Sequence, residues 1–156
     1  MSKKKFDMLK NMFDNNDIQS LIESIIYDTK DGYQLFGEYH IKKVGNKFIV
    51  TKNRTDLTEI FSNLKNAIVW TTMYKRDKLV DANRVKDLDI LLEGAVVSYE
   101  IHKKLAKKAK DLDTKTLHIV KLQEDQMKQQ AIIEELDRFV INAKNWQYRQ
   151  FKEAAK

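Results

Sequence analysis

The 156-residue chain is 42% hydrophobic and 33% charged, and its 29 lysines and arginines outnumber 23 acids, which gives a net charge of +6. The absence of cysteine excludes disulfides, thiol nucleophiles and thiolate metal sites, and the length suits one domain or a small head with a helical arm. No apolar run approaches the roughly 18 residues of a membrane span and the N-terminus has no signal-peptide pattern, so we expect a cytoplasmic protein without membrane association.

The first 30 residues are predicted to form two short helices. The run from Asp14 to Asp17 between them is rich in helix-capping residues, and Gly32 can take the left-handed conformation that ends the second helix. The apolar residues that recur at helical spacing are Phe6, Leu9, Met12 and Phe13 in the first helix and Leu21, Ile22, Ile25 and Ile26 in the second.

Residues 33–52 change from a period near 3.6 to a period of 2, which is typical of strands. Gly45 and Asn46 are a two-residue turn signal between two such runs, so an antiparallel hairpin is predicted. Gly37 interrupts the first run and predicts a β-bulge. The turn sets a register that pairs Lys43 with Phe48, Ile41 with Val50 and Tyr39 with Lys52, with the apolar members Tyr39, Ile41, Phe48 and Val50 on one face.

The next segment is predicted to be a helix that covers the apolar face of this hairpin. Asp56 is a candidate N-cap and Glu59 is the acid three residues later, while the basic residues in 75–78 mark the end of the helix. Trp70 is expected at the flank of the apolar stripe. The stripe itself consists of Leu57, Ile60, Phe61, Leu64, Ala67, Ile68 and Tyr74.

Residues 79–153 contain no proline and a single glycine, Gly94, and are predicted to form long helices. Two apolar seams, out of phase by one residue, meet near residues 111–114, where Asp-Leu-Asp-Thr is typical of a turn and a helix cap. We therefore expect an antiparallel helical hairpin; one continuous helix in a parallel dimer is the alternative. Four glutamines in the second seam predict a polar layer or a solvent-facing middle. The first seam is Val85, Leu88, Leu92, Ala95 and Tyr99, the second is Ile119, Leu122, Ile133, Leu136, Val140 and Ala143, and the glutamines are Gln123, Gln126, Gln129 and Gln130.

The predicted fold is mostly α and belongs to the α+β class. It consists of an N-terminal helical segment (residues 1–30), a head with one antiparallel β-hairpin packed on a helix (31–78), and a coiled-coil-like arm made of the helical hairpin (79–156). The narrow apolar stripes of such an arm are suited to burial against other helices.

No catalytic or metal-binding signature is present. His40, His102 and His118 lack metal-ligand spacing, and the last two would meet only if the arm folds back on itself. Neighbouring acids such as Asp87 and Asp89 do not face each other on a helix, so helix caps and solvated faces explain them. With no phosphate-binding glycine loop and no nucleophile motif, we expect a non-enzymatic protein without catalytic residues, cofactor, metal or small-molecule substrate.

A lysine cluster near the break between the long helices is the candidate polyanion-binding site. On a helix its side chains cover an arc of about 160°, and such a continuous basic face can follow phosphates without reading their sequence. The alternatives are an ordinary solvated face, or an internal match to Glu134, Glu135 or Asp137 of the facing helix. The cluster consists of Lys103, Lys104, Lys107, Lys108 and Lys110.

The C-terminal end concentrates aromatic residues, and interfaces favour Trp, Tyr and Arg. Trp146, Tyr148, Arg149 and Phe151 are therefore the candidate partner-binding residues. Packing of these side chains against the head of the same chain is an equal alternative.

Four short blocks carry a family resemblance: YQLFGEYHI at 33–41, FSNLKNAIVW at 61–70, KKAKD at 107–111 and NWQ at 145–147. Together they resemble a family of small uncharacterised proteins encoded by contractile-tailed phages that infect marine bacteria. The resemblance implies a viral protein that acts in assembly or host takeover. It assigns no activity and no role to any single residue.

We therefore expect an interaction or assembly protein that works through helix–helix contacts, as a homo-oligomer or with a protein partner in a larger particle. Its expected location is the host cytoplasm or the virion. The alternative function is sequence-nonspecific nucleic-acid binding, as in packaging, through the lysine cluster.

Overall fold

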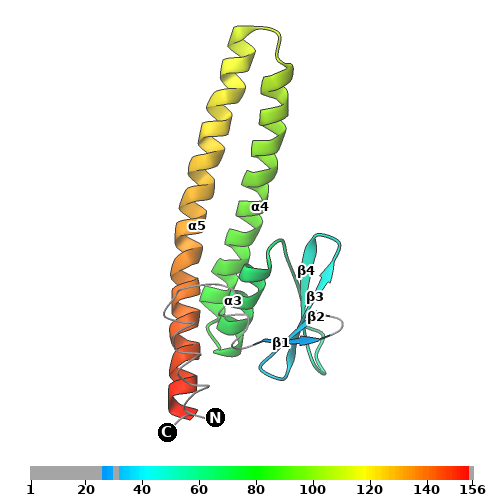
Figure 1. The fold of residues 1–156 in the computed structure, drawn as a ribbon, viewed down its shortest axis with the longest axis vertical. Helices are drawn as coiled ribbons and strands as arrows, with labels where there is room; N and C mark the ends of the chain where they lie inside the picture. Colours follow the sequence, from blue (N-terminus) through cyan, green and yellow to red (C-terminus); the bar gives the residue numbers. More distant parts are fainter. Residues whose placement is uncertain (1–25, 30–31, 155–156) are drawn as a thin grey trace.

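The computed structural model describes residues 26–29 and 32–154, and the predicted helices at 1–25 lie outside the described residues. It has an α+β fold in which a small sheet and one short helix sit at one end of a long helical hairpin (Figure 1). The mostly α architecture predicted from the sequence is thus confirmed. The elements are β1 (Ile26–Thr29), β2 (Gly32–Leu35), β3 (Tyr39–Val44), β4 (Lys47–Lys52), β5 (Thr58–Phe61), α3 (Leu64–Lys75), α4 (Leu79–Lys108) and α5 (Leu112–Ala154).

The predicted β-hairpin is present as β3 and β4. These strands pair in the expected register, which joins Tyr39 to Lys52, Ile41 to Val50 and Lys43 to Phe48. Gly45 in the turn has a φ of +64°, a left-handed conformation that glycine adopts without strain. The hairpin prediction is therefore confirmed at the level of single residues.

The sheet is larger than predicted, because this hairpin is the centre of a five-stranded antiparallel meander. Residues 26–29, expected at the end of a helix, form β1, and Gly32 begins β2 instead of ending that helix. A Cβ on Gly32 would lie 2.2 Å from the carbonyl oxygen of Ile41, so only glycine lets the strands approach there. Gly37 lies in the turn between β2 and β3 with a φ of +75°, so the predicted bulge is wrong.

The helix that covers the sheet begins later than predicted. Residues expected in its first turn form β5, the fifth strand, in which Phe61 is fully buried and Ile60 is exposed. The N-cap of α3 is Asn63 and not Asp56, since the Asn63 side chain accepts a hydrogen bond from the Asn66 backbone N–H at 3.2 Å. A strand of four residues is too short for its period of 2 to outweigh a neighbouring helical pattern.

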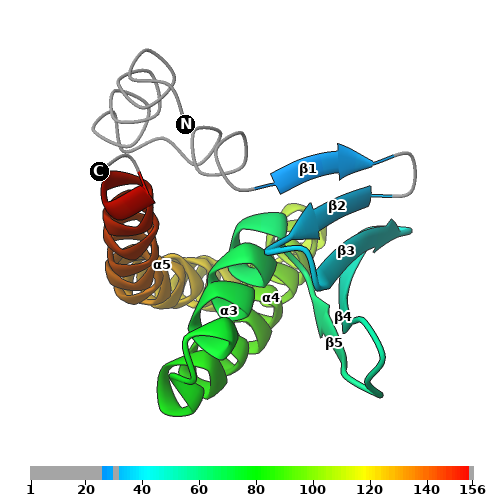
Figure 2. The same ribbon diagram turned by 90° about the horizontal axis from the view of Figure 1, so that it is seen from below.

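Helix α3 lies between the sheet and the long hairpin, so it is buried on almost every side (Figure 2). Trp70, expected at the flank of an apolar stripe, is only 3% exposed. Its ring stacks on Tyr74 with a centroid distance of 4.9 Å and tilts against Phe61 at 5.7 Å. The one-sided stripe predicted for this helix is therefore wrong, because two layers cover it.

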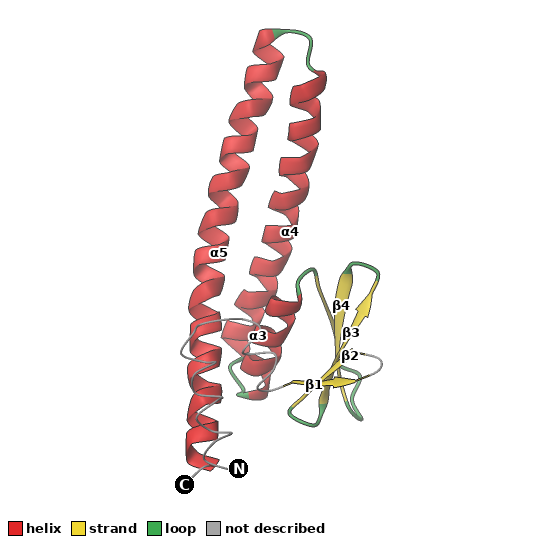
Figure 3. Ribbon diagram, viewed as in Figure 1, coloured by secondary structure: helices red, strands yellow, loops and turns green. Residues whose placement is uncertain are grey.

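The long segment folds back on itself as two antiparallel helices, α4 and α5, of roughly 45 and 65 Å (Figures 1 and 3). The continuous-helix alternative is thereby excluded. The predicted cap is also present, because the Asp111 carboxylate accepts from the Thr114 N–H at 2.9 Å and from the Thr114 hydroxyl at 2.8 Å. These hydrogen bonds lower the pKa of the Asp111 carboxyl.

The seam between the two helices changes character along its length. Near the head it is apolar as predicted, with Val85, Leu88, Leu136, Val140 and Ala143 buried in the same core as the sheet. Towards the turn the predicted seam of α5 is only partly present. Leu122 lies in it as predicted, but Ile119 and Ile133 are 41% and 39% exposed. The other seam positions are taken by His118, Asp125, Gln129 and Ile132.

Candidate functional site

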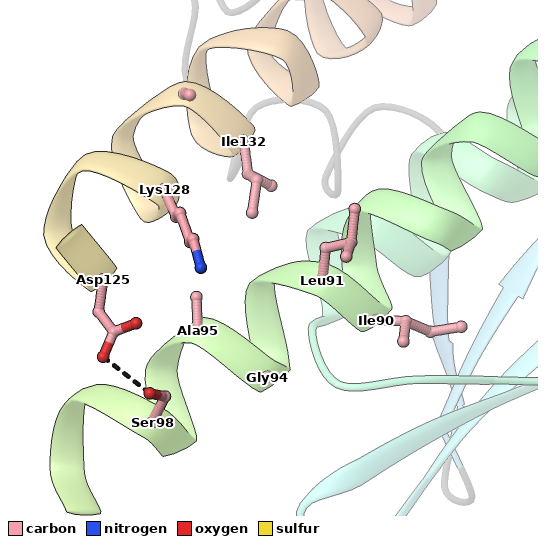
Figure 4. Close-up of a pocket in the computed structure, with 9 residues that line it drawn as sticks. Ile90, Leu91, Gly94, Ala95, Ser98, Asp125, Lys128 and Ile132 are labelled. Carbon is pink, nitrogen blue, oxygen red and sulfur yellow. Dashed lines mark hydrogen bonds between the residues drawn. The ribbon is translucent and has the colours of Figure 1, made fainter. Parts of the chain in front are cut away.

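A groove of about 520 Å³ opens between the two long helices, near the middle of α4 (Figure 4). Its walls are mostly apolar. Gly94 leaves it open on the α4 side, since no atom lies within 4 Å of the position that a Cβ would take. The residues that line it are Ile90, Leu91, Gly94, Ala95 and Ser98 from α4 and Asp125, Lys128, Ala131 and Ile132 from α5.

The floor of the groove is polar. Asp125, which is 5% exposed, accepts a hydrogen bond from the Ser98 hydroxyl at 2.8 Å (Figure 4). One turn further, the Gln129 side-chain amide donates to the backbone oxygen of Ala95 at 3.4 Å. Each predicted alternative thus holds for part of this region, since Gln129 forms a polar layer while Gln123, Gln126 and Gln130 are exposed to solvent. These polar contacts join the two helices beside the buried Ala95.

A second apolar stripe of α4 borders this groove and remains on the surface. Its five side chains are each more than 40% exposed, and together with Gly94 they occupy an arc of about 120° on the helix. We call this surface the α4 stripe. It consists of Ile90, Leu91, Val97, Ile101 and Leu105.

The lysine cluster lies at the end of α4 and in the turn, and all five side chains are exposed. Within the described ranges no acid lies within ion-pair distance of them. The alternative in which the lysine cluster pairs with Glu134, Glu135 or Asp137 of the facing helix is therefore wrong. Lys107 and Lys108 stand in the last turn of α4, where a positive charge also favours the helix dipole.

Glu134, Glu135 and Asp137 of α5 have other partners. Glu135 receives two hydrogen bonds from the Arg84 guanidinium, at 2.8 and 2.7 Å, and Asp137 forms an ion pair with Lys65 at 3.2 Å. Glu134 accepts from the Gln130 amide at 3.1 Å. The hydrogen bonds from Arg84 lower the pKa of the Glu135 carboxyl.

The helical hairpin brings His102 and His118 together across the seam, with their Nδ1 atoms 3.0 Å apart. A hydrogen bond at this distance requires one ring to donate and the other to accept. In the part of the chain that the structure describes, no group of three histidines or acids could hold a metal ion. The pair thus acts as a polar contact between α4 and α5, in line with the structural role expected for these histidines.

Of the candidate partner-binding residues, Trp146 is engaged within the chain. Its ring meets Phe36 edge-on at a centroid distance of 5.9 Å, and the Arg76 guanidinium lies over it at 5.3 Å. Burial lowers the pKa of the Arg76 guanidinium, and repulsion from Arg149 lowers it further. The internal packing alternative therefore holds for Trp146, Arg149 is exposed, and the side chains of Tyr148 and Phe151 lie outside the described part.

Sequence reasoning missed the contact that fixes the head on the arm. Asp89, expected in a cap or on a solvated face, is 2% exposed. Its carboxylate accepts from the Ser62 N–H at 3.0 Å, the Ser62 hydroxyl at 2.9 Å and the Asn66 amide at 2.9 Å. Glu93 also forms an ion pair with Lys47 of the sheet. The sequence does contain a signal for this contact, because Asp89 directly follows Leu88 of the apolar seam in α4.

Comparison with protein-family models, with curated proteins and with solved structures finds no match to this chain. Among the described helices, none has a stretch apolar and long enough to cross a lipid bilayer.

Proposed function

We propose that this protein is a non-enzymatic interaction protein whose helical hairpin docks on helices of other protein chains. The observation that carries the proposal is the α4 stripe, which borders an open groove over Gly94. Contiguous exposed apolar surface beside a groove is typical of a protein-binding site, whereas scattered apolar residues are not.

The polar floor of the groove supports the same conclusion. Where the seam holds Asp125, Gln129 and His118, the buried apolar residues of α4 are the small side chains Ala95 and Ala106. The larger side chains of Val97, Ile101 and Leu105 lie instead on the outside of α4. A third helix laid in the groove would bury them and complete a bundle.

The resemblance to contractile-tailed phage proteins, at the blocks around 33–41, 61–70, 107–111 and 145–147, supports a role in virion assembly. The protein would then act as an oligomer or as one component of a larger particle, in the host cytoplasm or in the virion. No small-molecule chemistry enters this proposal.

A photoreactive amino acid placed on α4 tests whether the stripe is a docking surface. At Ile101, in the stripe, we expect crosslinks to a protein chain in the cells in which the protein is made. The matched control is Lys103, which is also exposed but lies about 160° further round the helix. Equal crosslinking at the two positions, or none at Ile101, would overturn the proposal.

A second candidate function is sequence-nonspecific nucleic-acid binding through the lysine cluster. The observation that favours it is that all five lysines are exposed and unpaired with acids in the described ranges. Lysine supplies a compact charge that suits loose phosphate contact better than base recognition.

Salt-dependent binding to duplex DNA tests this second function. Replacing Lys103, Lys107 and Lys110 by glutamine should weaken binding and make the slope of log K against log salt shallower by up to about three. The control is Lys42→Gln, which removes an exposed lysine from β3. Unchanged affinity in the triple variant would eliminate this function.

A further inference from the structure

The free charges of α4 divide the helix into an acidic half and a basic half. In residues 79–93 the two bases, Arg84 and Lys86, are held by glutamates of other elements. Among the described residues the solvent-accessible acids of this half without an ion pair are Asp81, which lies towards the seam, and Asp87, which is exposed on the side of the stripe. Residues 94–108 carry one glutamate and four lysines, of which Lys104 and Lys108 lie on the side of the stripe. The α4 stripe lies across the boundary between these halves.

This arrangement favours antiparallel over parallel pairing of two α4 helices. Antiparallel packing places the acidic half of each helix against the basic half of the other, whereas parallel packing places like charges side by side. The charge pattern therefore identifies a second copy of the same helix as a complementary partner for the stripe.

We infer that the α4 stripe is covered by a second copy of this chain, packed antiparallel about a twofold axis near Val97 and Ser98. The inference rests on the proposed function and names the partner of the same surface. Residues at equal distances on opposite sides of the axis then face each other across the interface. The facing pairs are Asp87 with Lys108, Ile90 with Leu105, and Gly94 with Ile101.

The central apolar pair is complementary in size. Ile101 is 51% exposed and projects from the stripe, while Gly94 provides space where a side chain would otherwise stand. The groove of about 520 Å³ opens at this glycine. Each copy would insert Ile101 over Gly94 of the other, so the contact occurs twice.

The charged pair fixes the register. Asp87 and Lys108 are both exposed, lie on the same side of α4 as the stripe, and stand just beyond its two ends. A shift of one helical turn would remove both ion pairs and would place Gly94 opposite a different residue. Charge and size thus select the same alignment.

A charge swap in the purified full-length protein tests this register. Light scattering over a dilution series should show a dimer, and Asp87→Lys or Lys108→Asp should each raise its dissociation constant at least about tenfold, because the contact occurs twice. The double variant should return to within about threefold of the original value. A monomer at all concentrations, or no recovery in the double variant, overturns the inference.

Cysteine crosslinking tests whether the two α4 helices are antiparallel or parallel. The chain has no cysteine of its own, so only the introduced thiols can form disulfides. Val97→Cys should form a disulfide-linked dimer, since the two copies of residue 97 lie within about 2 Å along the helix axis. Ile90→Cys should not, because its copies would be about 22 Å apart. Crosslinking at both positions would indicate parallel helices and would contradict the inference.

The two proposals fail separately. If Ile101 crosslinks to a different protein while the purified chain stays monomeric, the docking function stands and the self-pairing is wrong. If Ile101 yields no protein crosslink in cells, the docking function itself fails.

Discussion

The buried carboxylate of Asp89 offers the sharpest test of how the head is held on the arm. Asp89→Ala removes the acceptor of three hydrogen bonds from Ser62 and Asn66. The Asn66 amide is then left without an acceptor at a site that is 2% exposed, while half-buried Ser62 can recruit water. The unsatisfied Asn66 amide costs about 1–3 kcal/mol, and the two hydrogen bonds that Ser62 loses contribute about 1 kcal/mol each, so we expect a loss of about 3–5 kcal/mol.

Urea unfolding followed by circular dichroism measures this loss. Asp89→Asn should cost less, about 2 kcal/mol, because its remaining oxygen still accepts while its amide opposes the Ser62 N–H. Glu100→Ala is the matched control, an exposed acid of the same helix, and should change stability by less than about 0.5 kcal/mol. A loss below about 1 kcal/mol in Asp89→Ala would show that the Asp89 carboxylate does not hold the head on the arm.

Three further predictions concern the seam, the turn and the sheet. Leu136→Asp should cost about 4 kcal/mol or more, because it places a charge in a 4%-exposed core site, and unchanged thermal melting would show that the seam is not buried there. Gly45→Val should cost about 1–2 kcal/mol through its left-handed φ of +64°, with Gly45→Asn as the tolerated control. Burial raises the pKa of Tyr39 to about 12, so its phenol stabilises the fold fully below pH 10 and this contribution is lost as pH rises through about 12. In Tyr39→Phe that alkaline loss, measured by urea unfolding, should be smaller.

The sequence predicted best those elements whose signals are local. Gly45 and Asn46 set the β3–β4 register, and Asp111 marked the cap where α5 begins. Strands β1 and β5 have four residues each, which is too short for periodicity to distinguish a strand from a helix. Their pairing depends on neighbours in the sheet that only the fold brings together.

The surfaces of the helical hairpin were predicted less completely, because polar residues occupy several seam positions between α4 and α5. The apolar pattern of α5 suggested Ile119 and Ile133 for the seam, whereas His118, Asp125 and Gln129 lie there and find partners across it. A polar residue at such a position is favourable only when a specific partner on the other helix satisfies it. Sequence alone does not show that pairing.

The two halves of the hairpin are therefore held by different forces. Near the head, Leu88, Leu136 and Val140 join the core of the sheet. Away from it, the helices meet through hydrogen-bonded pairs such as Ser98 with Asp125, and such contacts contribute less net stability than apolar packing. Local opening should then be easiest in this outer half, which carries Val97, Ile101 and Leu105 of the α4 stripe. A helix that docks on the stripe would order the part of the hairpin that is least stable by itself, so docking and local folding would be coupled.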